Sequence, residues 1–144
     1  MTATVPGVGL SRFVEAQRSI YPAALAELRA GRKTSHWMWF VFPQIAGLGT
    51  SAAAIFYAIE SAGEARSWLA HDPLGPRLRE CTNAVLAHAG KTAEAIFGPV
   101  DAMKLRSSMT LFDHVGGAGE PFGPCLDAFF SGPRDGRTLA LLGA

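Results

Sequence analysis

The side chains with the clearest chemical potential lie just after position 100. In a helix that starts near Asp101, the side chains of Lys104, Ser107 and Ser108 fall on one face. A cation beside paired hydroxyls near a helix start could hold an anion such as phosphate. Asp101 is a candidate acid or base for chemistry on such a ligand. Alternatively, the serines bond back to their own helix and have only a structural role.

Arg106 adds a guanidinium to the same stretch of chain. Its planar fork suits phosphate or carboxylate. The structural alternative is a surface ion pair with Asp113. Ser107 is a poor candidate for a nucleophile, because no His or Lys base can be assigned to it from the sequence. We therefore treat Arg106 and Ser107 as candidate ligand-binding residues.

A second set of candidates lies in the run His36-Trp-Met-Trp-Phe-Val-Phe-Pro-Gln44. His36 could act in acid–base chemistry, and Trp37 or Trp39 could stack on a purine or a sugar. Gln44 could read the edge of a base or an amide. The alternative is a buried aromatic core with one satisfied histidine and a glutamine that bonds the backbone of a glycine-rich turn.

Metal and cofactor sites are not expected. The four histidines are scattered without the spacing of zinc ligands, and the two cysteines form no CxxC pair. The sequences GVG (7–9) and GLG (47–49) lack the flanking strand and the Lys-Ser/Thr of a phosphate loop.

The composition is that of one folded domain. The 144 residues are 49% hydrophobic and 17% charged, with a net charge of +1, which disfavours nucleic acid or an anionic membrane as partner. The chain shows neither an export signal nor an apolar stretch of ~18 residues, so we expect a cytoplasmic location. Residues 1–9 are expected to form a flexible N-terminal arm, followed by a single helical domain over 10–144.

Apolar residues recur with helical spacing along most of the chain, so the expected fold is all-α, with about seven to nine short-to-medium helices in one compact domain. Candidate N-caps (Ser61, Asp72, Asp101 and Asp135) and glycines that follow helices (Gly31 and Gly90) delimit these helices. The expected helices cover about 10–18, 21–30, 61–69, 73–89, 92–97, 101–112, 122–129 and 135–142. Residues 36–43 are apolar on every side and show no partner strand, so we interpret them as a buried helix or an irregular core segment.

Four runs together resemble an uncharacterised bacterial family, the domain of unknown function numbered eighteen-ten, which genome annotation often labels calpastatin. The runs are GRKTSHWMWFVFPQIAGLG (31–49), LGPRLREC (74–81), IFGPVDAMKLRSSMTLF (96–112) and FFSGPRDGRTLALL (129–142). The resemblance implies a small all-α fold and no established activity. The calpastatin label conflicts with the sequence, because calpastatin inhibitor regions are disordered whereas three Trp and nine Phe predict a buried core. The family pattern often has two consecutive acids before KLRSSMTLF, whereas here Asp101 is followed by Ala102, so a mechanism that needs both acids is in doubt.

Two functions fit these observations, and the sequence does not decide whether the protein is an enzyme. The first is binding, with or without hydrolysis, of a nucleotide-like small molecule such as an ADP-ribose derivative, which would use the stackable Trp, the cations and Asp101. The second is a non-catalytic protein-interaction module, for which no complete catalytic constellation is needed. Convergence of His36, Gln44, Asp101, Lys104 and Arg106 on one cleft would favour the first.

Overall fold

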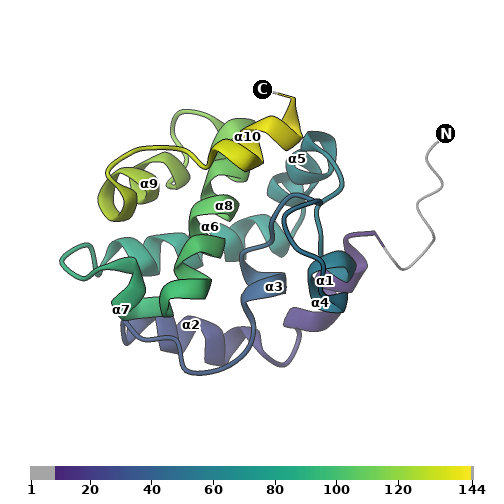
Figure 1. The fold of residues 1–144 in the computed structure, drawn as a ribbon. Coiled ribbons are helices and arrows are strands. Elements are labelled where there is room, and N and C mark those ends of the chain that lie inside the picture. The colour runs from purple at the N-terminus through teal and green to yellow at the C-terminus, as the bar shows by residue number, and fades with distance from the viewer. Residues whose placement is uncertain (1–8, 144) are drawn as a thin grey trace, which may run out of the picture.

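The longest helix, α8 (Pro99–Gly116), runs through the middle of the molecule (Figure 1). The computed structural model describes residues 9–143. Side chains on several faces of α8 are buried, including Leu105, Ser108, Met109 and Leu111, as expected for a helix enclosed by others. The helices that pack against it are α5 (Ala62–Ala70), α7 (Ala93–Phe97), α9 (Phe122–Phe130) and α10 (Gly136–Leu142).

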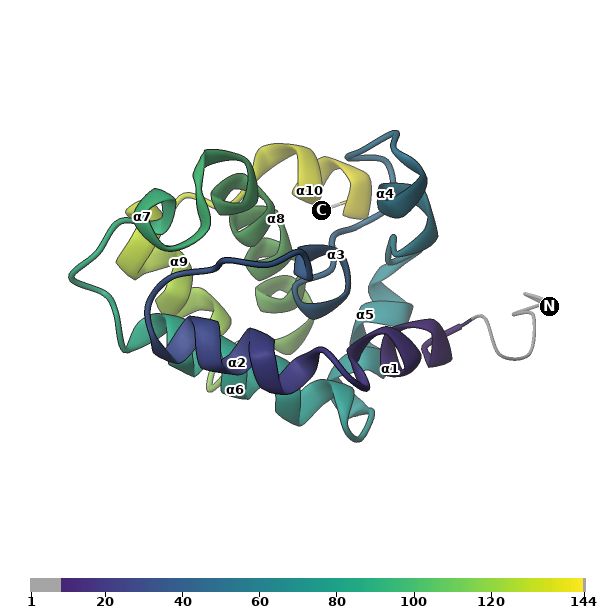
Figure 2. The same cartoon turned by 90° about the horizontal axis from the view of Figure 1, so that it is seen from below.

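The remaining helices cover this central group. Helix α6 (Leu74–Leu86) packs against α5 and α9, and on another side against α2 (Tyr21–Arg29), beside which it lies in Figure 2. Helix α1 (Ser11–Gln17) contacts α3 (Met38–Val41), and α4 (Ala52–Phe56) follows α3. The part of the chain that the structure describes thus forms one all-α domain of ten helices, which confirms the predicted fold class.

Local sequence signals place several helix ends where they were expected. The hydroxyl of Ser61 accepts a hydrogen bond from Glu64 N at the start of α5, and Thr92 and Asp135 cap α7 and α10 in the same way. Gly31 follows α2 with φ +76°, a left-handed conformation that glycine adopts without steric cost. The expected arm over residues 1–9 lies outside the described residues except for Gly9.

The apolar segment 36–43 contains only one short helix, α3, flanked by irregular chain. Trp37, Met38, Val41 and Phe42 are all buried, so the interpretation as a core segment is confirmed. Beyond it, the backbone of Ile45 pairs with that of Ile59 in an isolated parallel bridge. Neither this bridge nor α4 was expected from the sequence.

Within residues 9–143, no helix has the length and hydropathy required to cross a lipid bilayer.

The close packing of α5 against α6 can be tested by a substitution at their contact. A Cβ at Gly75 would lie 2.2 Å from the backbone oxygen of Leu69, so Gly75→Ala forces the backbone apart. We expect this substitution to lower the free energy of unfolding by about 1–3 kcal/mol, measured by urea denaturation.

Gly63→Ala is the matched control in α5. Its Cβ would meet only Ser61 Oγ, at an ordinary 3.6 Å. Since Ala favours helix over Gly, this variant should be as stable as the wild type or more stable by roughly 0.5 kcal/mol. Equal stability of the Gly75→Ala variant and the wild type would contradict the packing described.

Candidate functional site

The carboxylate of Glu27, in the last turn of α2, fixes the segment that leads into α3. It accepts hydrogen bonds from Thr34 N (2.7 Å), Ser35 N (3.0 Å), the Ser35 hydroxyl and Trp37 Nε1 (2.9 Å). Desolvation acts to raise the pKa of Glu27, but these hydrogen bonds, that of the Ser35 hydroxyl foremost, outweigh it and lower the pKa to about 2. Segment 34–37 is therefore held by one charged acceptor.

This segment brings Lys33 to α8. The backbone N–H of Lys33 donates to Ile96 O (2.8 Å), and its ammonium lies 2.8 Å from Asp101 Oδ2. The other carboxylate oxygen, Oδ1, lies 3.4 Å from Lys104 Nζ. Asp101 is thus shared by two lysines.

Each of the two lysines also lies over a tryptophan ring. Lys33 Nζ is 5.0 Å from the centre of the Trp37 ring, and Lys104 Nζ is 3.6 Å from that of Trp39. Such cation–π contacts and the shared carboxylate restrict both ammonium groups. The Lys33 side chain is only 7% exposed, whereas Lys104 is 20% exposed and reaches a surface groove.

The groove lies between α8, the start of α10, and α3 with the segment that follows it. Its volume is about 260 Å³. Apolar and polar side chains both line it: Trp39, Leu48, Val100 and Met103 are apolar, while Gln44, Lys104, Ser107, Asp135 and Arg137 are polar, and Gly49 completes the lining. Mixed linings of this kind, in which a few polar groups converge on an apolar surface, are typical of small-molecule sites.

The polar groups of the groove differ in how far they are already engaged. Ser107 donates to Met103 O (3.2 Å) and lies 3.4 Å from Asp135 Oδ2. That oxygen also caps α10 by accepting from Thr138 N and Oγ. The side chains of Gln44 and Arg137 have no hydrogen-bond or ion-pair partner within residues 9–143, so both remain available to a ligand.

Four of the residues singled out in the sequence meet in this groove. Trp39 and Gln44 come from one segment and Lys104 and Ser107 from α8. Asp101 does not line the groove but contacts it through Lys104.

The other candidates lie elsewhere. His36 is exposed and outside the groove lining, whereas Trp37 and Ser108 are buried in the core. The hydroxyl of Ser108 lacks a hydrogen-bond partner among the described residues. None of these three can contact a ligand bound in the groove without rearrangement.

Arg106 has a positioning role. Its guanidinium donates to the backbone oxygens of Pro133 and Arg134, both at 3.2 Å, and so fixes the chain that leads into α10. The structural alternative considered for it, an ion pair with Asp113, is wrong, because Asp113 pairs with Arg134 at 3.0 Å.

Asp135 and Arg137 are the polar groove residues that sequence reasoning missed. Asp135 was recognised only as a helix cap, and the short run GRT (136–138) carries no motif. The signal that identifies them is tertiary: Arg106 and Thr110 of α8 bind the backbone of residues 133–135 and thereby place the start of α10 beside Lys104.

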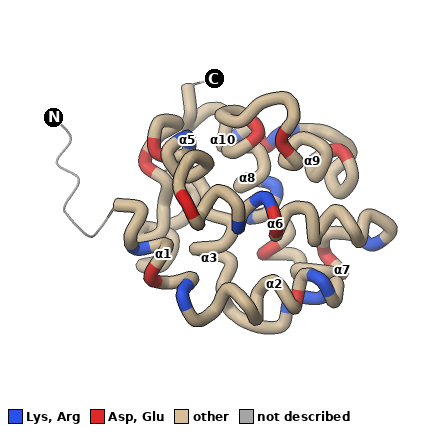
Figure 3. The backbone as a smooth tube through the Cα atoms, turned by 180° about the vertical axis from the view of Figure 1, so that it is seen from behind, with Lys and Arg blue, Asp and Glu red and all other residues tan. Residues whose placement is uncertain are grey.

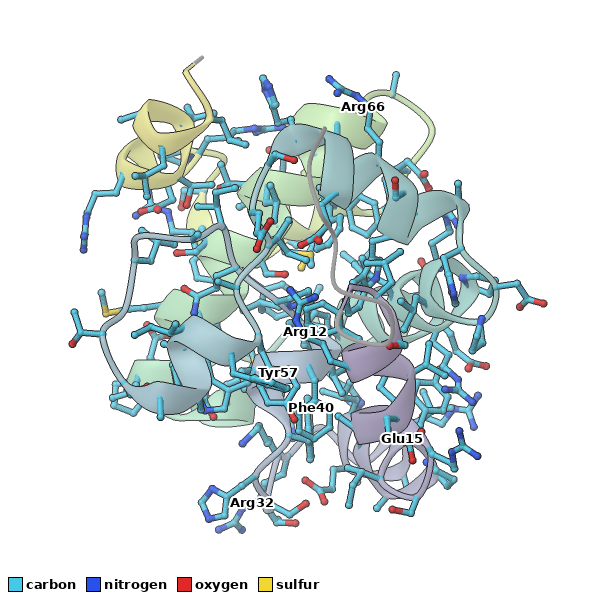
Figure 4. The ribbon with its side chains drawn as sticks, turned by 90° about the vertical axis from the view of Figure 1, so that its right-hand side faces the viewer. Arg12, Glu15, Arg32, Phe40, Tyr57 and Arg66 are labelled. Carbon is cyan, nitrogen blue, oxygen red and sulfur yellow. The ribbon has the colours of Figure 1, made fainter. Side chains whose placement is uncertain are left out.

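In two other clefts, the charged side chains are already paired with other groups of the protein. One, of about 400 Å³, lies where Arg12 and Tyr57 approach each other with Glu15 nearby (Figure 4). Its Arg12 guanidinium donates to Phe56 O (2.8 Å) and Ala58 O (2.7 Å), and so ties α1 to the chain around α4. Glu15 pairs with Arg18 at 2.9 Å.

The other cleft, of about 570 Å³, lies beside α9. Here Arg134 pairs with both Asp113 and Asp127. Glu120 forms two 2.8 Å hydrogen bonds with Arg79, which lower the pKa of the Glu120 carboxyl. Each carboxylate named here is therefore already paired with a guanidinium, although three carboxylates share two guanidinium groups.

Neither the distribution of charged residues nor the two cysteine thiols indicates another functional site. Basic and acidic positions are interspersed along the backbone in Figure 3, which agrees with the near-neutral net charge. Burial raises the pKa of both Cys81 and Cys125 to about 12, which makes their thiols unreactive. No group of His, Cys, Asp and Glu side chains that could hold a metal ion occurs among the residues described.

Comparisons with known proteins agree with the resemblance seen in the sequence. The family described as "Protein of unknown function (DUF1810)" matches residues 7–142. The chain is 51% identical to the conserved hypothetical protein Rv1873 from Mycobacterium tuberculosis, whose crystal structure superposes with a TM-score of 0.92. That match covers 95% of this chain and 98% of the other. No match was found among proteins with curated functions.

The Glu27 cluster predicts a specific dependence of stability on pH. Because folding lowers the pKa of Glu27 from 4.5 to about 2, its contribution is fully present above pH 4.5 and is lost as the pH falls toward 2. We expect Glu27→Gln to lower the free energy of unfolding at pH 7 by about 2 kcal/mol, through the loss of hydrogen bonds to a charged group. Denaturant unfolding of the two proteins should give stabilities that converge between pH 4.5 and 2.

Glu15→Gln is the control, since this pair with Arg18 is about 70% exposed on both sides and should contribute little. If the difference between wild type and the Glu27→Gln variant stayed constant from pH 7 to pH 2, the charged acceptor would not be what holds the segment.

Proposed function

The chain belongs to the family of proteins of unknown function DUF1810, and we propose that its groove between α8, α10, and α3 with the segment that follows it binds a small anionic metabolite of the nucleotide class, such as an ADP-ribose derivative. The observation that carries this proposal is the convergence of two cations, Lys104 and Arg137, with an unengaged amide, Gln44, beside an apolar surface. Cationic and amide donors form charge-assisted hydrogen bonds with an anion, and the apolar surface beside them accommodates the rest of a small ligand.

The two cations have different roles in this proposal. Lys104 is held in place by Asp101 and Trp39 before any ligand arrives, which lowers the entropic cost of binding. Arg137 is exposed, and its guanidinium can donate two parallel hydrogen bonds to an anionic group. Asp101 acts through Lys104 and is a positioning residue.

Hydrolysis has weaker support than binding. No histidine lines the groove, and the hydroxyl of Ser107 is engaged with its own helix and with Asp135. A nucleophile needs a neighbouring base to remove its proton, and the Asp135 oxygen beside Ser107 is already committed to Thr138 N and Oγ in capping α10. We therefore propose binding and assign no catalytic step. The cytoplasmic location expected from the sequence is part of the same proposal.

A protein-interaction module is the second candidate, and the exposure of several large apolar side chains favours it. Val100 and Met103 at the groove rim are 66% and 72% exposed, and Ile55 and Phe56 on α4 are 66% and 53% exposed. A partner protein captured by the wild type but not by a Phe56→Ser variant would support this function. A monomeric protein that captures no partner would contradict it.

The test of the proposed function is thermal unfolding with and without ADP-ribose. A ligand at 100 times its Kd adds about 2.7 kcal/mol to stability, which should raise the Tm by several degrees. Arg137→Gln should weaken binding by roughly tenfold through the loss of a charge-assisted contact.

Arg66→Gln is the matched control, because Arg66 is exposed on α5 and does not line the groove. Arg66→Gln changes the net charge by the same amount as Arg137→Gln does, and this variant should bind ADP-ribose as tightly as the wild type. An unchanged Tm of the wild type at millimolar ADP-ribose, or equal weakening by the two substitutions, would contradict the proposed site.

A further inference from the structure

A carboxylate lines the groove beside its two cations, and binding of a simple anion does not account for it. Asp135 Oδ2 is used to cap α10, but Oδ1 has no hydrogen-bond partner within residues 9–143. An ionised carboxylate accepts hydrogen bonds and repels anions. It favours a ligand only if that ligand also presents hydrogen-bond donors.

The donors are more consistent with hydroxyl groups than with an ammonium group. Among residues 9–143, three cations (Lys33, Lys104 and Arg137) and two carboxylates (Asp101 and Asp135) lie in or directly behind the groove, which leaves one net positive charge. A ligand with net negative charge is therefore favoured over a zwitterion such as an amino acid. An ammonium at Asp135 would also lie near two like charges.

Size and the position of Lys104 restrict the ring that can enter. The groove volume of about 260 Å³ is below the ~300–1,000 Å³ that is typical of pockets for drug-sized ligands. The ammonium of Lys104 lies 3.6 Å from the centre of the Trp39 ring and covers one face of it, so a planar base cannot stack on that face. A small saturated ring fits these limits better than a purine.

We propose that the groove recognises the sugar-phosphate part of its ligand, a refinement that rests on the proposed function. The phosphate binds Arg137 and Lys104, and sugar hydroxyls donate to Asp135 Oδ1 and to the amide oxygen of Gln44. The less polar face of the sugar packs on Leu48 and Met103, which line the same groove. A nucleobase, where the ligand has one, stays outside the groove.

Isothermal titration calorimetry with small probes tests this inference. We expect ribose 5-phosphate to bind at least tenfold more tightly than inorganic phosphate and to compete with ADP-ribose, whereas adenosine and leucine do neither. Equal affinity for inorganic phosphate and ribose 5-phosphate would overturn the recognition of hydroxyls. Competition by adenosine, or by leucine as the zwitterion, would overturn the inference as well.

Asp135→Asn tests the carboxylate directly, because Asn is also a good N-cap and should preserve α10. It should weaken ribose 5-phosphate by about fivefold and leave inorganic phosphate unchanged or tighter, since a repulsive charge is removed. Glu94→Gln, outside the groove, is the control with the same charge change. An unchanged affinity for ribose 5-phosphate would overturn the role of Asp135. If the Asp135→Asn variant does not fold, the wild-type ratio of the two affinities decides.

The two proposals fail differently. If ADP-ribose raises the Tm and ribose 5-phosphate does not compete with it, the sugar-phosphate inference is wrong and the proposed function stands. If ADP-ribose and ribose 5-phosphate both fail to bind, the proposed function is wrong.

Discussion

One carboxylate, that of Glu27, determines where the N-terminal third of the chain meets the central helix. Four donors from residues 34–37 converge on it, and the strength of these bonds is reflected in a pKa of about 2. The indole of Trp37 can therefore be fully buried with its polar N–H satisfied. Without this acceptor, the buried indole N–H of Trp37 would be left unpaired, which is costly in an apolar core, whereas the backbone N–H groups of Thr34 and Ser35 are exposed and would bond to water.

From Glu27 a continuous set of contacts leads to the groove. Trp37 lies under Lys33, Lys33 and Lys104 share Asp101, and Lys104 covers Trp39. The cation that reaches the groove is thus held by groups on two segments distant in sequence. Rigid placement of a charged donor is what distinguishes a binding site from a solvated surface lysine. The structural and the functional roles of the sequence run HWMWFVFPQ are in this way complementary: Trp37 builds the core and Trp39 lines the groove.

Helix periodicity and capping residues were sufficient to predict the all-α fold and most helix ends, because those signals are local. Asp135 and Ser61 are predicted as caps for this reason, and they do cap α10 and α5. The same prediction for Asp72 and Asp101 is wrong, because no side chain among the described residues caps α6 and α8 begins at Pro99, before Asp101. The bridge between Ile45 and Ile59 could not be predicted, since the segments around these two residues show no alternation of apolar and polar residues that would indicate strand pairing.

The groove could not be predicted in full either, because it depends on tertiary contacts that leave no local signal in the sequence. Lys104 and Gln44 were recognisable by type, but the contribution of Arg137 depends on Arg106 holding the chain before α10. The burial of Ser108 on α8 likewise depends on which helices surround that face.

The central claim, that ligand binds beside Trp39, is tested most directly by the three indole N–H signals in a ¹H–¹⁵N NMR titration with ADP-ribose. Trp39 lines the groove, whereas Trp37 is bonded to Glu27 and Trp68 is buried at the contact with Phe13 and Phe112. We expect the indole signal of Trp39 and the side-chain amide of Gln44 to shift with one saturation curve, while the indoles of Trp37 and Trp68 stay in place. Saturable shifts confined to residues around Arg12 and Tyr57, with the Trp39 signal unmoved, would contradict the claim.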